Sequence, residues 1–325
     1  MKFKTLFSTL FFTTLSSALF AGFTATDAVS EGSNPVSGGM SFSGSGSVDE
    51  LITAGGSNEY YFIRFQGTNI NFDSDKDLNT TATNVQLGTS KYSFKIENAT
   101  TTLNFTGKGA LNLANSSSSG GMYISQATTM NFEKGCGGLQ AGKIAVANTN
   151  LSVFNINEKN AIYSNTKIDP VLCLVGIAVR FNLTADQAFS MDLRHNSTVN
   201  VSATAGSNLI FSDVNQIVLQ DGNAPVSKIN FLEDFEGAVL IDTNSLTSFD
   251  VENKQVLVNA GGKDNCVLNF TADSGFDWDS ITWTEDFIYE GNSYLRIGVA
   301  VPEPAEWAMI FGGIALGLAI YRRRK

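Results

Sequence analysis

One short phrase recurs along this chain and restricts its fold more than any other feature: an apolar residue, an asparagine and a second apolar residue. Alternate side chains of an extended strand point to opposite faces, so each phrase puts two apolar side chains on one face and an amide on the other. The steps between successive asparagines are 33, 27, 24, 27, 18, 30 and 39 residues. The central residues of the phrases are Asn71, Asn104, Asn131, Asn155, Asn182, Asn200, Asn230 and Asn269.

The intervals between these phrases indicate a repeat fold. Strands with one apolar face, separated by turns rich in Gly, Asn and Ser, are typical of a solenoid whose rungs stack over one continuous core. Residues 101–105 and 128–132 read Thr-Thr-Leu-Asn-Phe and Thr-Thr-Met-Asn-Phe, as expected of neighbouring rungs. We therefore predict an all-β protein whose body, residues 22–300, is a parallel β-helix. The irregular steps leave a β-sandwich as the alternative.

The charge of the chain limits its partners. The formal net charge is -10, and six of the 21 basic residues lie at the two ends. With the six basic residues of the ends and the two glutamates of the C-terminal tail set aside, 15 basic and 29 acidic residues remain, a charge of -14. Such a body repels phosphate backbones, so we expect no nucleic-acid partner.

The N-terminal residues have the layout of a targeting segment. Residues 1–21 contain two lysines, an apolar run rich in Phe and Leu, and then small residues, which is the order of a secretory signal peptide. We expect the leader to end near Ala21. Further on, Ser47 followed three residues later by Glu50 fits a capping box, which predicts one short helix there.

The chain ends in a short apolar segment followed by four positive charges. The uncharged run from Trp307 to Tyr321 has 15 residues. As a helix it measures about 22 Å, against about 30 Å of bilayer hydrocarbon. We expect a short C-terminal transmembrane helix with these two aromatic residues at its interfaces. The basic residues after it, expected on the cytoplasmic side, are Arg322, Arg323, Arg324 and Lys325.

Directly before the apolar segment stands Pro302-Glu303-Pro304. This triplet, a short apolar helix and an arginine cluster at the terminus resemble the PEP-CTERM sorting signal of Gram-negative bacteria, over residues 301–325. The resemblance implies an exported protein that is held in the inner membrane, processed near the triplet by an exosortase, and delivered to the cell surface or the extracellular matrix. Ala305-Glu306 follows where many members carry a small hydroxyl residue, so the exact cleavage position stays open.

The stretch from Asp273 to Val301 is crowded with aromatic residues and ends in an alternating strand pattern. Aromatic side chains on the last rungs would close the open apolar end of a solenoid, so we predict a C-terminal cap. A sugar-stacking platform of Trp278 and Trp283 is the alternative, although five residues apart on one strand they point to opposite faces. The segment with its tail resembles the end of secreted, autotransporter-like β-repeat proteins.

Catalytic candidates are few. His195, the single histidine, would have to serve any Ser-His-Asp triad with Ser190 or Ser197, and no nucleophile-elbow motif accompanies it. A polysaccharide lyase on a β-helix would need acids clustered with a basic residue. Arg180 and Arg194 are the only arginines between Arg64 and Arg296, and no acidic cluster stands one rung away from either.

Metal and disulfide candidates are equally weak. The loop Asp73–Asn79 has the alternating oxygen spacing of a calcium loop, but Leu78 stands where such loops carry glycine and Asn84 where they carry a bidentate glutamate. A solvated acidic loop is the favoured interpretation. The spacing of the three cysteines, Cys136, Cys173 and Cys266, excludes a zinc site and leaves either one disulfide or three free thiols.

The sequence therefore favours a non-enzymatic role without a cofactor. We expect an exported structural or adhesive protein of the cell surface or extracellular matrix, which presents Asn, Thr and Ser to matrix polysaccharide. Its processing partner is expected to be an exosortase, with membrane contact only through the C-terminal helix before processing. A secreted polysaccharide lyase or hydrolase on the same scaffold is the alternative.

Overall fold

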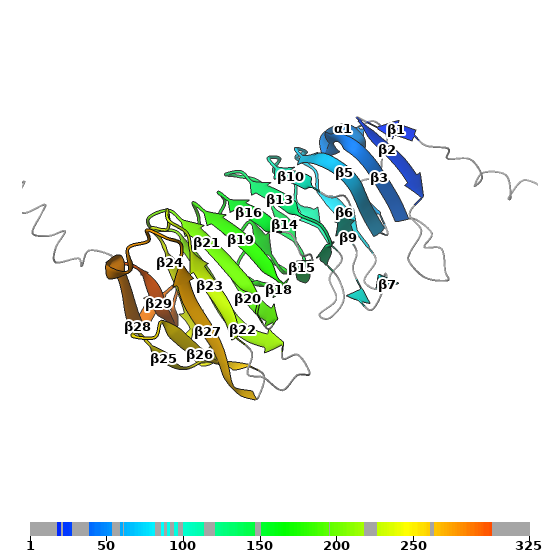
Figure 1. Ribbon diagram of the computed structural model, residues 1–325. Helices are drawn as coiled ribbons and strands as arrows, with labels where there is room; N and C mark the ends of the chain where they lie inside the picture. The colour runs from blue at the N-terminus through cyan, green and yellow to red at the C-terminus, as the bar shows by residue number, and fades with distance from the viewer. Residues whose placement is uncertain are drawn as a thin grey trace, which may run out of the picture.

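The protein is an elongated parallel β-helix that runs from the N-terminal strands at one end to a C-terminal cap at the other (Figure 1). The predicted leader up to residue 17, the tail 301–325 and His195 lie outside the residues that the computed structural model describes. The described residues are 18–20, 22–27, 39–53, 59–60, 62–81, 86–87, 90–91, 94–96, 100–113, 121–146, 151–194, 196–217, 226–260 and 263–300.

The asparagine phrases form one parallel ladder, here called the first ladder. Each strand pairs in parallel with the strand one rung before it and one rung after it. The ladder consists of β5 (Phe62–Phe72), β10 (Thr101–Phe105), β13 (Thr128–Phe132), β16 (Ser152–Ile156), β19 (Ala178–Leu183), β21 (Thr198–Ala203), β23 (Val226–Phe231) and β27 (Lys263–Ala272).

Two further parallel ladders complete the rungs. The second ladder starts beside the first half of β5 and contains β9 (Phe94–Ile96), β12 (Met122–Ile124), β15 (Lys143–Val146), β18 (Val171–Val175), β20 (Gln187–Arg194), β22 (Asn208–Ile217) and β24 (Ala238–Asp242). The third ladder contains β4 (Glu59–Tyr60), β6 (Leu78–Thr80), β11 (Leu111–Asn112), β14 (Leu139–Gln140) and β17 (Ile162–Tyr163). A small separate hairpin pairs β7 (Gln86–Leu87) with β8 (Ser90–Lys91).

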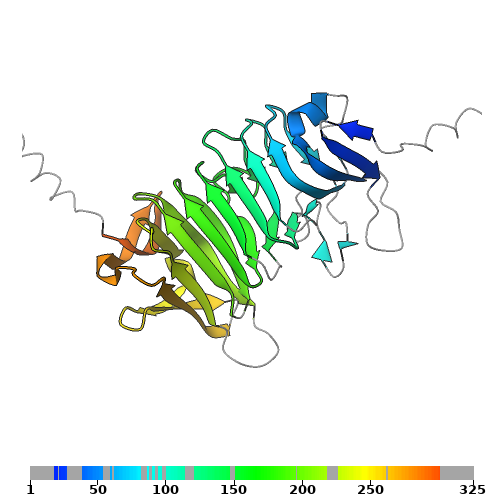
Figure 2. The same ribbon diagram turned by 45° about the horizontal axis from the view of Figure 1, so that its top comes forward.

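The third ladder ends partway along the helix. After β17, the chain passes from β19 directly to β20 and from β21 directly to β22, so these rungs are built from two ladders only. Figure 2 shows the strands of the body stacked side by side between the N-terminal strands, in blue, and the C-terminal cap, in orange. The parallel pairing confirms the predicted β-helix, whereas a sandwich would be built from antiparallel sheets.

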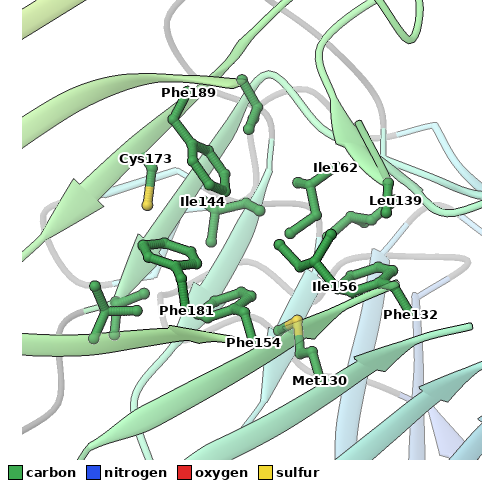
Figure 3. Close-up of a cluster of buried hydrophobic side chains, with 14 of the residues drawn as sticks. Met130, Phe132, Leu139, Ile144, Phe154, Ile156, Ile162, Cys173, Phe181 and Phe189 are labelled. Carbon is green, nitrogen blue, oxygen red and sulfur yellow. The ribbon is translucent and has the colours of Figure 1, made fainter. Parts of the chain in front are cut away.

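The core is one continuous stack of apolar side chains inside the rungs. On the first ladder, the rings of Phe72, Phe105 and Phe132 stack with centroids 4.5 Å apart at both steps. In the middle rungs, Phe154 and Phe181 lie among aliphatic side chains that arrive from the other two ladders (Figure 3). Burial of each such ring contributes about 2–3 kcal/mol of transfer free energy, which makes this stack the main source of stability.

The turn between the first and third ladders requires glycine because backbone packs directly on backbone. The N–H of Gly107 donates to Phe72 O at 2.9 Å, and the N–H of Gly137 donates to Gly107 O at 2.9 Å. A Cβ atom on Gly137 would lie 2.3 Å from the carbonyl oxygen of Lys108. At Gly107 and Gly137 the turns are thus close contacts between rungs.

The N-terminal end of the core is covered by a short helix, α1 (Val48–Thr53). It buries Val48, Leu51 and Ile52, and the N–H of Glu50 donates to Ser47 Oγ at 3.1 Å, which confirms the predicted N-cap. β3 (Gly39–Ser47) pairs in parallel with β5 and antiparallel with β2 (Phe23–Asp27), which pairs in turn with β1 (Ala18–Phe20). β1 lies inside the predicted leader, residues 1–21.

The C-terminal end is closed by antiparallel strands. β25 (Leu246–Asp250), β26 (Gln255–Ala260) and β27 form a meander, and β28 (Ile281–Tyr289) and β29 (Asn292–Val299) form a hairpin whose second strand pairs with β24. Phe276, Trp278 and Trp283 pack against the core from this end. The predicted aromatic cap is confirmed.

Within the residues that the structure describes, no helix has the length and apolar character needed to cross a membrane. The predicted transmembrane helix from Trp307 to Tyr321 falls in the tail that lies outside this part of the chain.

Candidate functional site: the Asn/Thr face

The outward side of the first ladder carries a row of hydrogen-bonded asparagine amides. Asn71, Asn104, Asn131, Asn155 and Asn182 lie in register on five successive strands. From rung to rung, each Nδ2 donates to the preceding Oδ1, at 2.8, 2.7, 2.6 and 2.6 Å. The parallel register produces this row because it brings identical phrase positions together at the strand spacing of about 4.8 Å.

The row does not use up its hydrogen-bonding capacity. An amide group has two N–H donors and two acceptor lone pairs. At Asn131 and at Asn155 the row uses one donor and one lone pair, and both side chains are only half-buried. Each therefore keeps one donor and one acceptor for a partner outside the protein.

The row changes position at Arg180. Asn200 lies in register with Arg180, two residues before Asn182, so Asn200 and Asn230 belong to a neighbouring column of the face. Asn269 lies in register with Lys228, in the column beside that one. Arg180 spans the change, since its Nε donates to Asn182 Oδ1 at 2.7 Å. In the new column the Nδ2 of Asn230 donates to Asn200 Oδ1 at 3.1 Å.

The surrounding outward positions complete what we call the Asn/Thr face. In the paired segments of the first ladder from residue 69 to residue 271, which the structure describes throughout, the outward positions hold two cations and no carboxylate. The face consists of Asn69, Asn71, Thr102, Asn104, Thr129, Asn131, Val153, Asn155, Ala178, Arg180, Asn182, Thr198, Asn200, Ser202, Val226, Lys228, Asn230, Val267, Asn269 and Thr271.

The acidic loop after β5 binds neighbouring rungs with its carboxylates. Asp73 Oδ1 accepts from Ser47 Oγ at 2.9 Å and from the N–H of Asp49 at 3.0 Å, and Asp77 Oδ1 accepts from the N–H of Ala110 at 2.8 Å. Within the described residues, His, Cys, Asp and Glu form no group that would hold a metal ion. Asp73 and Asp77 thus connect their loop to backbone and hydroxyl groups of adjacent segments.

The remaining catalytic candidates that the structure describes lie on or beside two different ladders. Ser197 is buried and donates to Ser227 Oγ at 3.2 Å, and Ser190 lies half-buried on β20. Arg194 lies exposed at the end of β20, in the second ladder, while Arg180 belongs to the first. His195 lies outside the described residues.

Cys136 and Cys173 are free, buried thiols. Burial raises the pKa of Cys136 to about 11, against the lowering effect of Lys167, and raises the pKa of Cys173 to about 12. Both are therefore protonated and unreactive at neutral pH, and a disulfide between them is excluded. The side chain of Cys266 lies outside the described residues.

The two tryptophans belong to the cap. Trp278 begins the 3-10 helix η2 (Trp278–Ser280) and contacts the ring of Phe231, while Trp283 on β28 stacks on Phe249 with centroids 6.0 Å apart. Lys254 lies over the Trp278 ring at 4.9 Å. The sequence pattern placed both tryptophans on one strand, which is wrong, because Trp278 lies in η2 and Trp283 on β28. Their expected role in packing is confirmed.

One long-range contact fixes the tip of the C-terminal hairpin. The hydroxyl of Tyr289 donates to Asp186, Glu290 forms an ion pair with Lys159, and the Lys159 ammonium lies 5.9 Å from the centre of the Tyr289 ring. Burial and the bond to Asp186 raise the pKa of Tyr289. No sequence pattern pointed to this contact.

The triplet Pro302, Glu303 and Pro304 lies outside the described residues, as do the membrane-anchor residues after it. Comparisons with models of protein families, with curated proteins and with solved structures give no significant match for this chain.

Proposed function

We propose that the protein is an exported structural or adhesive component of the cell surface or extracellular matrix, and that its Asn/Thr face contacts polysaccharide. The observation that supports this proposal is the row of half-satisfied amides on a regular, rigid face. Hydroxyl groups of sugars both donate and accept hydrogen bonds. An amide that keeps one donor and one acceptor suits them.

The rigidity of the face favours such a role. Every outward residue stands on a strand that is paired on both sides and anchored from beneath by buried apolar side chains. A surface that is already ordered loses little conformational entropy when it binds a long polymer.

Sorting forms the second part of the proposal. The leader, residues 1–21, would direct export, and Pro302, Glu303 and Pro304 would be the element that an exosortase processes. The test is the intact mass of cell-associated and secreted protein, with and without the triplet replaced by alanines. We expect loss of the tail in the unmodified protein only. An intact tail in both forms, or processing that the alanines do not change, would contradict this part.

Binding is tested separately on purified protein. Asn131→Leu/Asn155→Leu removes the amides from the centre of the face and keeps similar side-chain volume. We expect weaker retardation in native gels that contain soluble polysaccharide. The matched control is Asn253→Leu, in an exposed turn of the cap several rungs beyond Asn131 and Asn155. Equal retardation of all three proteins would overturn the role of the face.

A further inference from the structure

We propose that Arg180, oriented by Asn182, is an anion-binding residue at the centre of the Asn/Thr face. The polysaccharide partner then carries sparse carboxylate groups on an otherwise neutral chain. This inference rests on the proposed function, because it specifies the partner of the same face.

The position of Arg180 provides the first argument. It lies in register between Val153 and Asn200, so a short apolar side chain and an amide are its neighbours along the column. Its Nε donates to Asn182 Oδ1 at 2.7 Å, which fixes the plane of the guanidinium. The terminal Nη1 and Nη2 groups are not needed for this bond. A guanidinium held in this way presents the paired N–H groups that match a carboxylate in bidentate geometry.

The second argument is that the side-chain hydrogen bond of Arg180 goes to an amide, Asn182, and not to a carboxylate. Neither Arg180 nor Lys228 takes part in the ion pairs of Lys159 with Glu290 and of Lys167 with Glu158. The nearest carboxylate bonded to the face is that of Asp273, which accepts from Asn230 Nδ2 at 2.9 Å at the C-terminal edge. Lys228 lies two rungs beyond Arg180, in the column next to that of Asn200. At the usual strand spacing, Arg180 and Lys228 are roughly 10 Å apart along the helix axis. The paired segments of the face thus carry two cations on a body whose net charge is negative.

The net negative charge of the body favours a sparsely charged anionic polymer over a densely charged one. The body's charge of -14, outside the two end segments, repels a polymer with a charge on every unit. A chain of mainly neutral sugars avoids this repulsion, places its hydroxyl groups on the amides and delivers an occasional carboxylate to Arg180. A nucleic acid, with one phosphate per nucleotide, is disfavoured for the same reason.

The experiment compares three polysaccharides and single-stranded DNA in native affinity gels at low salt. Gellan has sparse uronates, dextran is neutral, and polygalacturonate is charged on every sugar. We expect the tightest binding to gellan. Arg180→Gln should weaken binding to gellan at least about tenfold and weaken binding to dextran much less. Arg180→Lys keeps the positive charge but loses the paired N–H groups of the guanidinium, so its affinity for gellan should lie between those of Arg180→Gln and the unmodified protein.

Arg194→Gln is the matched control, since Arg194 is an exposed arginine outside the face. Thermal unfolding of each variant checks that the fold is kept. If Arg180→Gln binds gellan as well as the unmodified protein does, the inference fails while the proposed function stands. If no polysaccharide binds, both fail. Tighter binding to polygalacturonate or to DNA would overturn the assignment of a sparsely charged partner.

Discussion

The side-chain amide of Gln187 pairs with the backbone of Ile162 in the way that a neighbouring strand would. The N–H of Ile162 donates to Gln187 Oε1 at 3.1 Å, and Gln187 Nε2 donates to Ile162 O at 2.7 Å. Ile162 lies on β17, the last strand of the third ladder, and Gln187 is fully buried. One side chain therefore ends a parallel ladder without leaving the backbone groups of Ile162 unpaired.

Replacing this amide should destabilise the fold strongly. Gln187→Met keeps a similar volume but leaves both buried groups of Ile162 without a partner, so we expect a loss of about 2–4 kcal/mol in the free energy of unfolding. Urea unfolding measures it. The control is Gln140→Met, whose amide donates to Asn165 O at 3.2 Å near the surface and should cost under about 1 kcal/mol. Equal losses in both variants would contradict the strand-like role of Gln187.

The asparagine row predicts a variant with inverted pH dependence. In Asn155→Asp the new carboxylate cannot donate to Asn131 Oδ1, so two oxygens would face each other where a bond of 2.6 Å stands now. We expect a loss of about 1–3 kcal/mol at neutral pH. Protonation restores the donor, so the variant should regain stability relative to the unmodified protein as the pH falls toward about 4. Thermal unfolding at pH 7 and 4 checks this; a gap that widens in acid would contradict it.

The close contact at Gly137 predicts a severe effect of a single methyl group. Gly137→Ala places Cβ 2.3 Å from the carbonyl oxygen of Lys108 and 2.4 Å from Gly109, both backbone groups that cannot rotate away. We expect a loss of at least about 3 kcal/mol. Gly135→Asn is the control, because Gly135 has open space around it and a φ of 83°, which asparagine tolerates. Similar stability of the two variants would show that the turns are not tightly stacked.

The two buried thiols predict a loss of stability in alkali. The pKa values of Cys136 and Cys173 are raised to about 11 and about 12, whereas an unfolded thiol ionises near about 8.5. Their contribution is therefore complete below about pH 8.5 and declines as the pH rises through the folded-state values. In a Cys266→Ser background, iodoacetamide at pH 8 should label the native protein only as fast as it unfolds. Immediate labelling would contradict the burial of these thiols.

Period-2 alternation made the first ladder predictable, because the inward and outward positions of each phrase follow from local geometry alone. The change of column at Asn200 was not predictable. The residue that pairs with Asn182 one rung later is Ser202, whereas the next phrase is centred on Asn200, 18 residues after Asn182. The length of this rung depends on the loss of a third-ladder strand, which the sequence does not show. The role of Gln187 was missed for a similar reason, because it depends on which residue lies one rung away.

Tyr289 contacts Asp186, and the two residues are 103 positions apart in the chain. Forming a contact between residues so far apart closes a very long loop, which has a high entropic cost in the unfolded chain. This cost falls once the intervening rungs have folded. The hairpin tip should then dock late, after the strands beneath it have already formed. The connectivity of the chain therefore sets the order of assembly: the rungs of the β-helix form first, and the C-terminal hairpin packs onto them afterwards.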